Sequence, residues 1–108
     1  MFLKPESVYW VWVTTDSVIM TEAGYVLYIA LQSDAAGASA VGLYDGIDSS
    51  GDLIDLIRAN QYNRTKINYS IPRAVKKGLF LDLGANVEGV LVGFTYEDFT
   101  YLDTLAKT

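Results

Sequence analysis

Three acidic side chains in one Gly- and Ser-rich stretch are the residues whose types and spacing first suggest chemistry. Asp45, Asp48 and Asp52 follow one another closely, and carboxylate oxygens are the ligands that Ca²⁺ prefers. The stretch lacks the alternating acidic positions and the closing Glu of an EF-hand loop. Because Asp, Ser and Gly also form turns by bonding to their own backbone, we interpret this stretch as a turn, and we expect no metal and no cofactor.

Catalysis by the common side-chain bases has little support in this chain. There is no His and no Cys, which removes the commonest general base and two frequent ligands of transition metals. Glycoside hydrolysis would need two carboxylates facing each other across a cleft, and none of the 13 acidic residues belongs to a recognisable motif. We therefore expect a protein that is not an enzyme.

Composition restricts the partners further. The net charge of −5 argues against nucleic acid, which is bound through clustered Lys and Arg. No apolar run approaches the ~20 residues of a membrane span, and the first residues do not resemble a signal peptide, so we expect a soluble chain without a membrane partner. The chain is 51% hydrophobic and only 19% charged. In a small domain such an apolar excess favours an interface, and we expect a homo-oligomer.

The elements that would position these side chains are short strands. Alternating apolar runs are separated by Gly-, Asp- and Ser-rich turns, and no helical period is sustained. The pattern predicts one all-β domain over residues 1–108, an antiparallel β-sandwich or jelly-roll-like fold of roughly seven or eight short strands. A closed barrel is the alternative, and residues 1–6 and 97–108 are expected to be terminal arms. Strands are expected at 7–14, 18–20, 25–32, 40–44, 53–58, 64–71, 79–83 and 90–96. For 53–58 one or two turns of helix are the alternative, and a strand is favoured because the flanking residues are typical of a hairpin.

Alternation within these strands predicts which side chains face the core. Pro72 cannot donate a ladder hydrogen bond, so it should end its strand or mark a sheet edge. The side chains expected in one buried set are Val41, Leu43, Ile67, Tyr69, Leu79, Leu81, Val90 and Val92. The same reasoning adds Tyr25, Leu27, Ile29, Leu31 and Ile71 to the core faces of their strands.

Aromatic residues supply the candidate interface. Trp10 and Trp12 alternate with Tyr9, Val11 and Val13, so both faces of the first strand are apolar. Such a strand is either covered on both faces by its own chain or anchors a partner, and Trp is enriched in the cores of interfaces. The candidate interface residues are Trp10, Trp12, Tyr28, Tyr101 and Leu102.

Five segments between residues 38 and 96 follow one another in a distinctive order. They are Val41-Gly42-Leu43-Tyr44-Asp45-Gly46, Asp48-Ser49-Ser50-Gly51, Ile71-Pro72, Gly78-Leu79-Phe80-Leu81 and Asn86-Val87-Glu88-Gly89-Val90. With them about half of the chain resembles a small recurrent protein of tailed bacteriophages. In that group a strand ending in Leu-Tyr-Asp-Gly leads into a Ser/Gly turn, and a Gly-Leu-aromatic strand precedes a terminal Asn-Val-x-Gly-Val strand. The five segments are turn and core residues, so they indicate the fold more strongly than the function.

The resemblance implies a non-enzymatic virion protein with a β-sandwich fold, most readily a capsid decoration (cement) protein. Its partners would be the major capsid protein or other virion proteins, in a homo-oligomer for which a trimer is favoured. It would be made in the host cytoplasm and would reside on the capsid exterior, where an acidic protein is kept away from packaged DNA. The alternatives are a head–tail connector, a tail component, or a carbohydrate- or receptor-binding module that uses Tyr44, Tyr62, Tyr69 and Tyr101 as stacking platforms.

Overall fold

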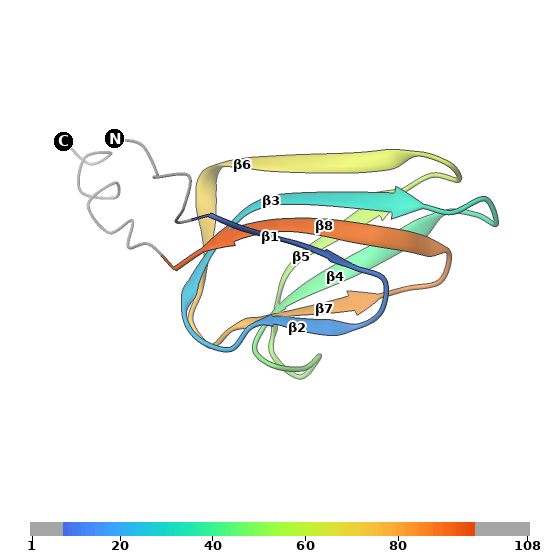
Figure 1. Cartoon of the computed structure of the whole chain (residues 1–108). Helices are drawn as coiled ribbons and strands as arrows, with labels where there is room; N and C mark the ends of the chain where they lie inside the picture. The colour runs from blue at the N-terminus through green and yellow to red at the C-terminus, as the bar shows by residue number, and fades with distance from the viewer. Residues whose placement is uncertain (1–7, 97–108) are drawn as a thin grey trace.

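The structure of the chain is a computed structural model that describes residues 8–96. Two antiparallel four-stranded sheets pack face to face, one with the order β1-β8-β3-β6 and the other with the order β2-β7-β4-β5 (Figure 1). The strands are β1 (Tyr9–Val13), β2 (Ser17–Met20), β3 (Gly24–Ser33), β4 (Ser39–Asp45), β5 (Asp52–Ala59), β6 (Arg64–Val75), β7 (Leu79–Leu83) and β8 (Val87–Thr95). The all-β sandwich expected from the sequence is confirmed. The expected terminal arms, 1–6 and 97–108, lie outside the described residues.

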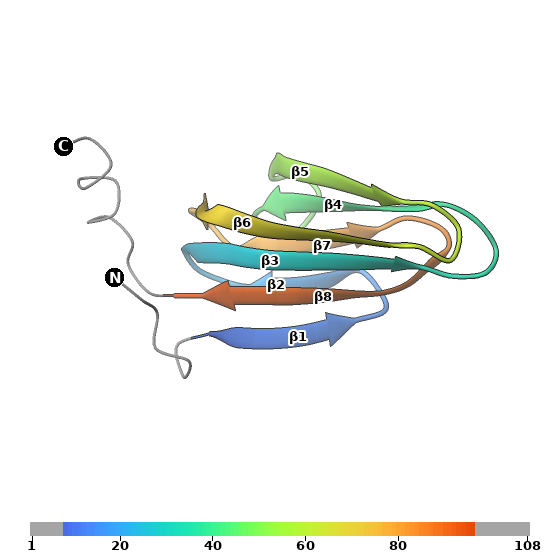
Figure 2. The same cartoon turned by 90° about the horizontal axis from the view of Figure 1, so that it is seen from above.

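Strand pairing follows the jelly-roll scheme. The chain changes sheet at every connection except the one between β4 and β5, which lie side by side in one sheet. As a result β1 pairs with β8, β2 with β7, β3 with β6 and β4 with β5, all antiparallel. This is the pairing of one long hairpin, with its bend between β4 and β5, rolled into two layers. As a result β1 and β2 form the edges on one side of the sandwich, and β5 and β6 form the edges on the other (Figure 2).

The core lies between the two sheets and consists of the side chains that alternation points inward. All eight members of the set predicted from the sequence contribute, although Ile67 and Tyr69 are only partly buried and pack against it. Fully buried members from β3, β4, β7 and β8 are Ile29, Leu31, Val41, Leu43, Leu79, Leu81, Val90 and Val92. Ser33 closes one end, because its hydroxyl lies 2.5 Å from the Ser39 hydroxyl and donates to the Ala59 carbonyl oxygen at 3.1 Å.

A β-bulge changes the alternation within β3. The register shifts between Val26 and Tyr28, so that Val26 is fully buried while Tyr25 and Leu27 are only partly buried. The prediction that Tyr25 and Leu27 share the core face of Ile29 is therefore wrong for the first half of this strand. The physical reason is that a bulge inserts one residue and inverts the inward and outward positions on one side of it.

The same irregularity overturns the prediction for Ile71. Val26 pairs with Arg73 and Tyr28 with Asn68. The segment 69–72 of β6 therefore lies opposite a single residue of β3, Leu27. Ile71 lies in this segment and is 76% exposed. Pro72, which it precedes, lacks the N–H that regular pairing needs, and β6 is an edge strand, as Pro72 suggested.

Side chains of β6 close the β5–β6 side of the sandwich. The Tyr69 hydroxyl donates to Asp55 Oδ2 at 2.8 Å, and the Arg73 guanidinium donates to the Ile54 carbonyl oxygen at 2.8 Å. Thr65 Oγ1 donates to the Arg58 carbonyl oxygen at 2.6 Å. These bonds join two strands of different sheets, and the last two use backbone carbonyl oxygens of β5.

Replacing Leu81 with Asp should abolish folding, because Leu81 is completely buried and an unpaired carboxylate there costs several kcal/mol out of a total stability of about 5–15 kcal/mol. Circular dichroism on heating should show no cooperative transition for L81D. The matched control is Leu53→Asp, since Leu53 belongs to the same sheet but is 55% exposed. A cooperatively melting L81D would show that the inward face of β7 is assigned wrongly.

Replacing Tyr69 with Phe should lower the unfolding free energy by about 1 kcal/mol, the usual net value of one hydrogen bond. Tyr62→Phe is the control, because Tyr62 is 70% exposed and its substitution should change the unfolding free energy very little.

Burial and the hydrogen bond to Asp55 raise the pKa of Tyr69 above its ordinary value. The folded state therefore holds this proton more tightly, and wild-type stability should fall as the pH rises above about 10, the pKa of an unfolded tyrosine. Urea titrations between pH 7 and 11 should show a smaller fall for Y69F than for Y62F.

Candidate functional site

An aromatic surface covers part of the outer face of the β1-β8-β3-β6 sheet. We define it as Trp10 and Trp12 of β1 together with Tyr28 of β3. Val11 and Val13 pack against the core, so the alternate residues of β1 point outward, and Trp10 and Trp12 are 58% and 47% exposed. Both candidate tryptophans therefore lie on the outer face of the sheet, and the third described candidate, Tyr28, lies on the same face.

Glycine in the central strand β8 brings Trp10 and Tyr28 together. Gly93 is the register partner of Trp10 on one side and of Tyr28 on the other. The two rings meet edge to face across it, with their centroids 5.6 Å apart and their planes at 65°. A Cβ atom at position 93 would lie 2.6 Å from Trp10 Cζ3, closer than real Cβ contacts come. Only glycine at position 93 leaves room for the Trp10 ring to lie against the sheet.

Trp12 uses a second glycine in the same way. Its indole ring occupies the space that a side chain at Gly89 would fill. Leu91, the register partner of Trp12, lies between the two glycines on the same face of β8. The outer face of the sheet therefore carries two indole rings held close to the backbone, which makes the aromatic surface broad and low rather than a pair of projecting side chains.

The glycines are the functional residues that the sequence interpretation missed. Glycine in a strand often marks a position where another group approaches closely, and Gly89 and Gly93 are both at outward positions of a mostly apolar strand. The spacing of these two glycines could have indicated a close contact on that face. Which side chains make the contact became clear only from the register of β8 with β1. The other two predicted interface residues, Tyr101 and Leu102, lie outside the described residues.

The acidic stretch is used to build turns. The Asp45 carboxylate accepts the backbone N–H groups of Lys76, at 3.0 and 3.1 Å, and of Lys77, at 2.8 Å. Burial acts to raise the pKa of Asp45, but these N–H donors outweigh it and the pKa is lowered. Asp48 accepts from the backbone N–H of Ser50 at 2.9 Å. Between residues 8 and 96 no three acidic side chains are grouped as metal ligands would be.

The tyrosines considered as sugar platforms are not gathered into one site. Tyr44 lies on β4 of the other sheet, and Tyr62 lies in the turn between β5 and β6 with a φ of 63°. Tyr69 is held by its hydrogen bond to Asp55 at the closed side of the sandwich. Tyr101 lies outside the described part of the chain.

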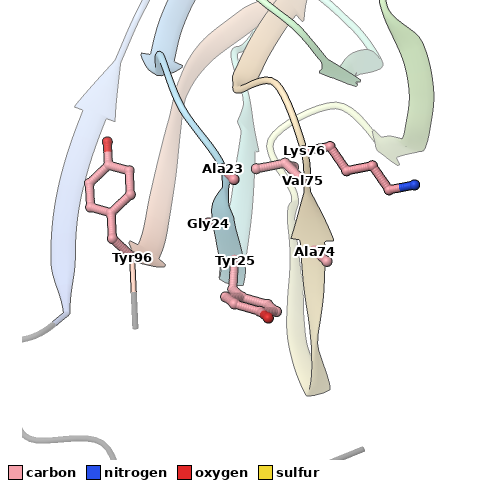
Figure 3. A pocket seen from close by; sticks show the side chains of 7 residues that line it. All are labelled: Ala23, Gly24, Tyr25, Ala74, Val75, Lys76 and Tyr96. Atoms are coloured by element: carbon pink, nitrogen blue, oxygen red, sulfur yellow. The ribbon is translucent and has the colours of Figure 1, made fainter. Parts of the chain in front are cut away.

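A hollow of about 390 Å³ opens where β3 begins and where β6 and β8 end, with Tyr25, Val75 and Tyr96 among its lining (Figure 3). Its walls are mainly apolar, and the amino group of Lys76 points away from Tyr96. Burial, with Glu22 and Tyr9 nearby, raises the pKa of Tyr96. The polar atoms drawn there do not converge on a common point, so the hollow does not form a catalytic arrangement.

A second apolar strip crosses the outer face of the other sheet. Val18 pairs with Phe80, Phe80 with Tyr44, and Tyr44 with Leu53, so that one row spans all four strands. Beside it, Gly42 leaves a shallow hollow of about 160 Å³ bordered by Tyr44 and Leu56. Both outer faces of the sandwich are thus partly apolar.

No helix in the described part of the chain is long and apolar enough to cross a membrane.

Comparisons of the chain with family models, with curated proteins and with solved structures give no match.

Replacing Gly93 with Ala should displace the Trp10 ring from Tyr28 while the sheet stays intact, because Trp10 is exposed and free to turn away. We expect a shifted tryptophan emission maximum with an unchanged far-ultraviolet circular dichroism spectrum. Gly46→Ala is the matched control, since a Cβ atom there would find its nearest neighbour at 3.4 Å and lies outside the aromatic surface. Identical emission from G93A and the wild type would contradict the close packing described for Trp10.

Proposed function

We propose that this chain is a non-enzymatic structural protein of a tailed-phage virion that binds neighbouring shell subunits through its aromatic surface. The observation that supports the proposal most directly is the exposure of Trp10 and Trp12 side by side on a rigid sheet. Trp is the side chain most often found as a binding hot spot, because it buries a large apolar area with few rotatable bonds. A soluble chain gains little from such rings in water unless a partner covers them.

The fold is compatible with this role. Jelly rolls occur in viral capsid proteins and in lectins, although a fold alone does not determine a function. The resemblance of residues 38–96 to a small phage protein also supports a role in a virion. The net charge of −5 suits the outside of a capsid, where the protein does not meet packaged DNA.

In this role the protein would act as a decoration, or cement, protein. Its partner would be the major capsid protein, and the chain would assemble as a homo-oligomer. A protein that binds the assembled shell and not its dissociated subunits stabilises the shell by mass action, by RT ln(1 + [L]/Kd) for each site. Positions at the head–tail connector or in the tail are the neighbouring alternatives, and they differ only in which virion protein covers the aromatic surface.

Expanded, DNA-free capsids of the phage that encodes this chain provide the test. Wild-type protein should co-sediment with these shells and raise their melting temperature. Trp12→Ala should weaken binding by at least about 30-fold, the effect of losing roughly 2 kcal/mol at a hot spot. The control is Tyr62→Ala, which removes an exposed aromatic ring away from the aromatic surface and should bind as wild type does.

Two results would overturn the proposal. Wild-type protein that ignores the shells and binds purified tails would place the function at the tail. Equal binding of W12A and wild type would show that another surface makes the contact.

A second candidate is a carbohydrate-binding module. In that case the aromatic surface, rather than the dispersed tyrosines, would bind the sugar. Outward residues two apart in a strand are about 6.6 Å from each other, and low-lying indole rings at that spacing can stack on the faces of successive sugars. Titration with soluble oligosaccharides, followed by tryptophan emission, should then show saturable changes that W12A lacks. An absence of hits for the wild type on a broad glycan array would remove this candidate.

A further inference from the structure

The edge of β1 differs from the three other edges of the sandwich. Among residues 8–96, β1 is hydrogen bonded only to β8, and Figure 2 shows it as the outermost strand on its side. Its five residues pair with β8 without a register shift, and they include no charged residue, no Gly and no Pro. An unpaired edge of this kind is a template for another strand.

Each of the other edges carries a device that opposes pairing. β2 has only four residues and a register shift between Val18 and Met20. β6 contains Pro72 and the irregular segment 69–72, and it carries Arg64, Lys66 and Arg73. β5 carries Asp52, Asp55 and Arg58, and the backbone oxygens of Ile54 and Arg58 are already bonded to β6 side chains. Short strands, bulges, Pro and charges are the usual means of blunting an edge, and β1 has none of the last three.

The sequence of β1 is complementary to itself. If two copies pair antiparallel with Val11 at the centre, Val11 faces Val11 of the second copy, Trp10 faces Trp12, and Tyr9 faces Val13. Directly opposed residues share one face of a sheet, so the valines meet on the inner face and the tryptophans on the outer face. Opposed aromatic pairs contribute favourably across antiparallel strands.

Charge also favours a second copy at this place. Two chains of net charge −5 repel each other, and a contact through β5 would bring Asp52 and Asp55 toward their own copies. β1 is an uncharged strip at which self-association avoids this repulsion. Its outward side chains are those of the aromatic surface, so pairing would join two aromatic surfaces into one.

We propose that two copies of this chain associate through β1, which forms a continuous eight-stranded sheet about a two-fold axis at Val11. The occupant of the edge is thus a second copy in antiparallel orientation. A symmetric dimer of this kind buries the same strand on both partners. It is an alternative to the trimer expected from the phage resemblance, and it does not depend on binding to a capsid.

Single cysteines in an otherwise Cys-free chain test both the contact and its register. In the proposed pairing the two Val11 Cα atoms lie about 4.5–5.5 Å apart, within the range that a disulfide spans. Val11→Cys should therefore cross-link to a dimer under mild oxidation, at least about ten-fold faster than the matched control Val13→Cys. Val13 lies on the same strand and is also partly buried, but the two Val13 positions would be about 13 Å apart. A mixture of Tyr9→Cys and Val13→Cys should form the heterodimer, because these two positions face each other.

Sedimentation equilibrium of wild-type protein completes the test, with the mass of two chains as the expected result. A monomeric wild type, a trimer, or equal cross-linking of V11C and V13C would each overturn the proposal. The circular dichroism spectrum of V11C under reducing conditions establishes that the variant folds, and if it does not, the Tyr9→Cys and Val13→Cys mixture still reads the register. All measurements use purified protein without capsids, so failure of the dimer and failure of the proposed shell binding are separate outcomes.

Discussion

The apolar layer between the two sheets is the interaction on which the rest of the structure depends. With no Cys in the chain, no disulfide supports the fold, and the interdigitated valines, leucines and isoleucines of β3, β4, β7 and β8 hold the sheets together. On the outer face, β8 carries glycines at outward positions, and the Trp10 and Trp12 rings lie over them.

The two sides of the sandwich are finished in different ways. On one side, side chains of β6 reach across to β5 and satisfy its backbone oxygens. On the other side, β1 ends its sheet with an unbroken, uncharged strand. The β5–β6 side is therefore bridged by side-chain hydrogen bonds, whereas the β1 edge has no such bridge among the described residues. The aromatic surface lies next to the β1 edge. Contacts with other chains are therefore expected to be concentrated around β1 rather than spread over the whole surface.

Much of the fold could be predicted because alternation is a local property. The inward residues of β4, β7 and β8 were predicted correctly from the period of two, whereas the same period left open whether the tryptophans of β1 are covered. The errors at Tyr25, Leu27 and Ile71 arose where β3 and β6 lose register, which depends on how two distant strands fit and leaves only Pro72 as a trace in the sequence. The aromatic surface was half predicted for the same reason: Trp10, Trp12 and Tyr28 were named, but the glycines beneath them gain their meaning only from the pairing of β1 with β8.

The pairing of β1 with β8 has a consequence for synthesis of the chain. Tyr9 is matched with Phe94, so β1 leaves the ribosome well before its partner β8 and must wait for β8 before it can pair. Pairings between distant parts of a chain form slowly, because a long loop must close before any contact is gained. During that interval the nascent chain exposes Tyr-Trp-Val-Trp-Val, an apolar β-forming segment of the kind that aggregates. Expression yield should therefore be limited by this waiting time, and slower translation would lengthen it rather than help the protein to fold.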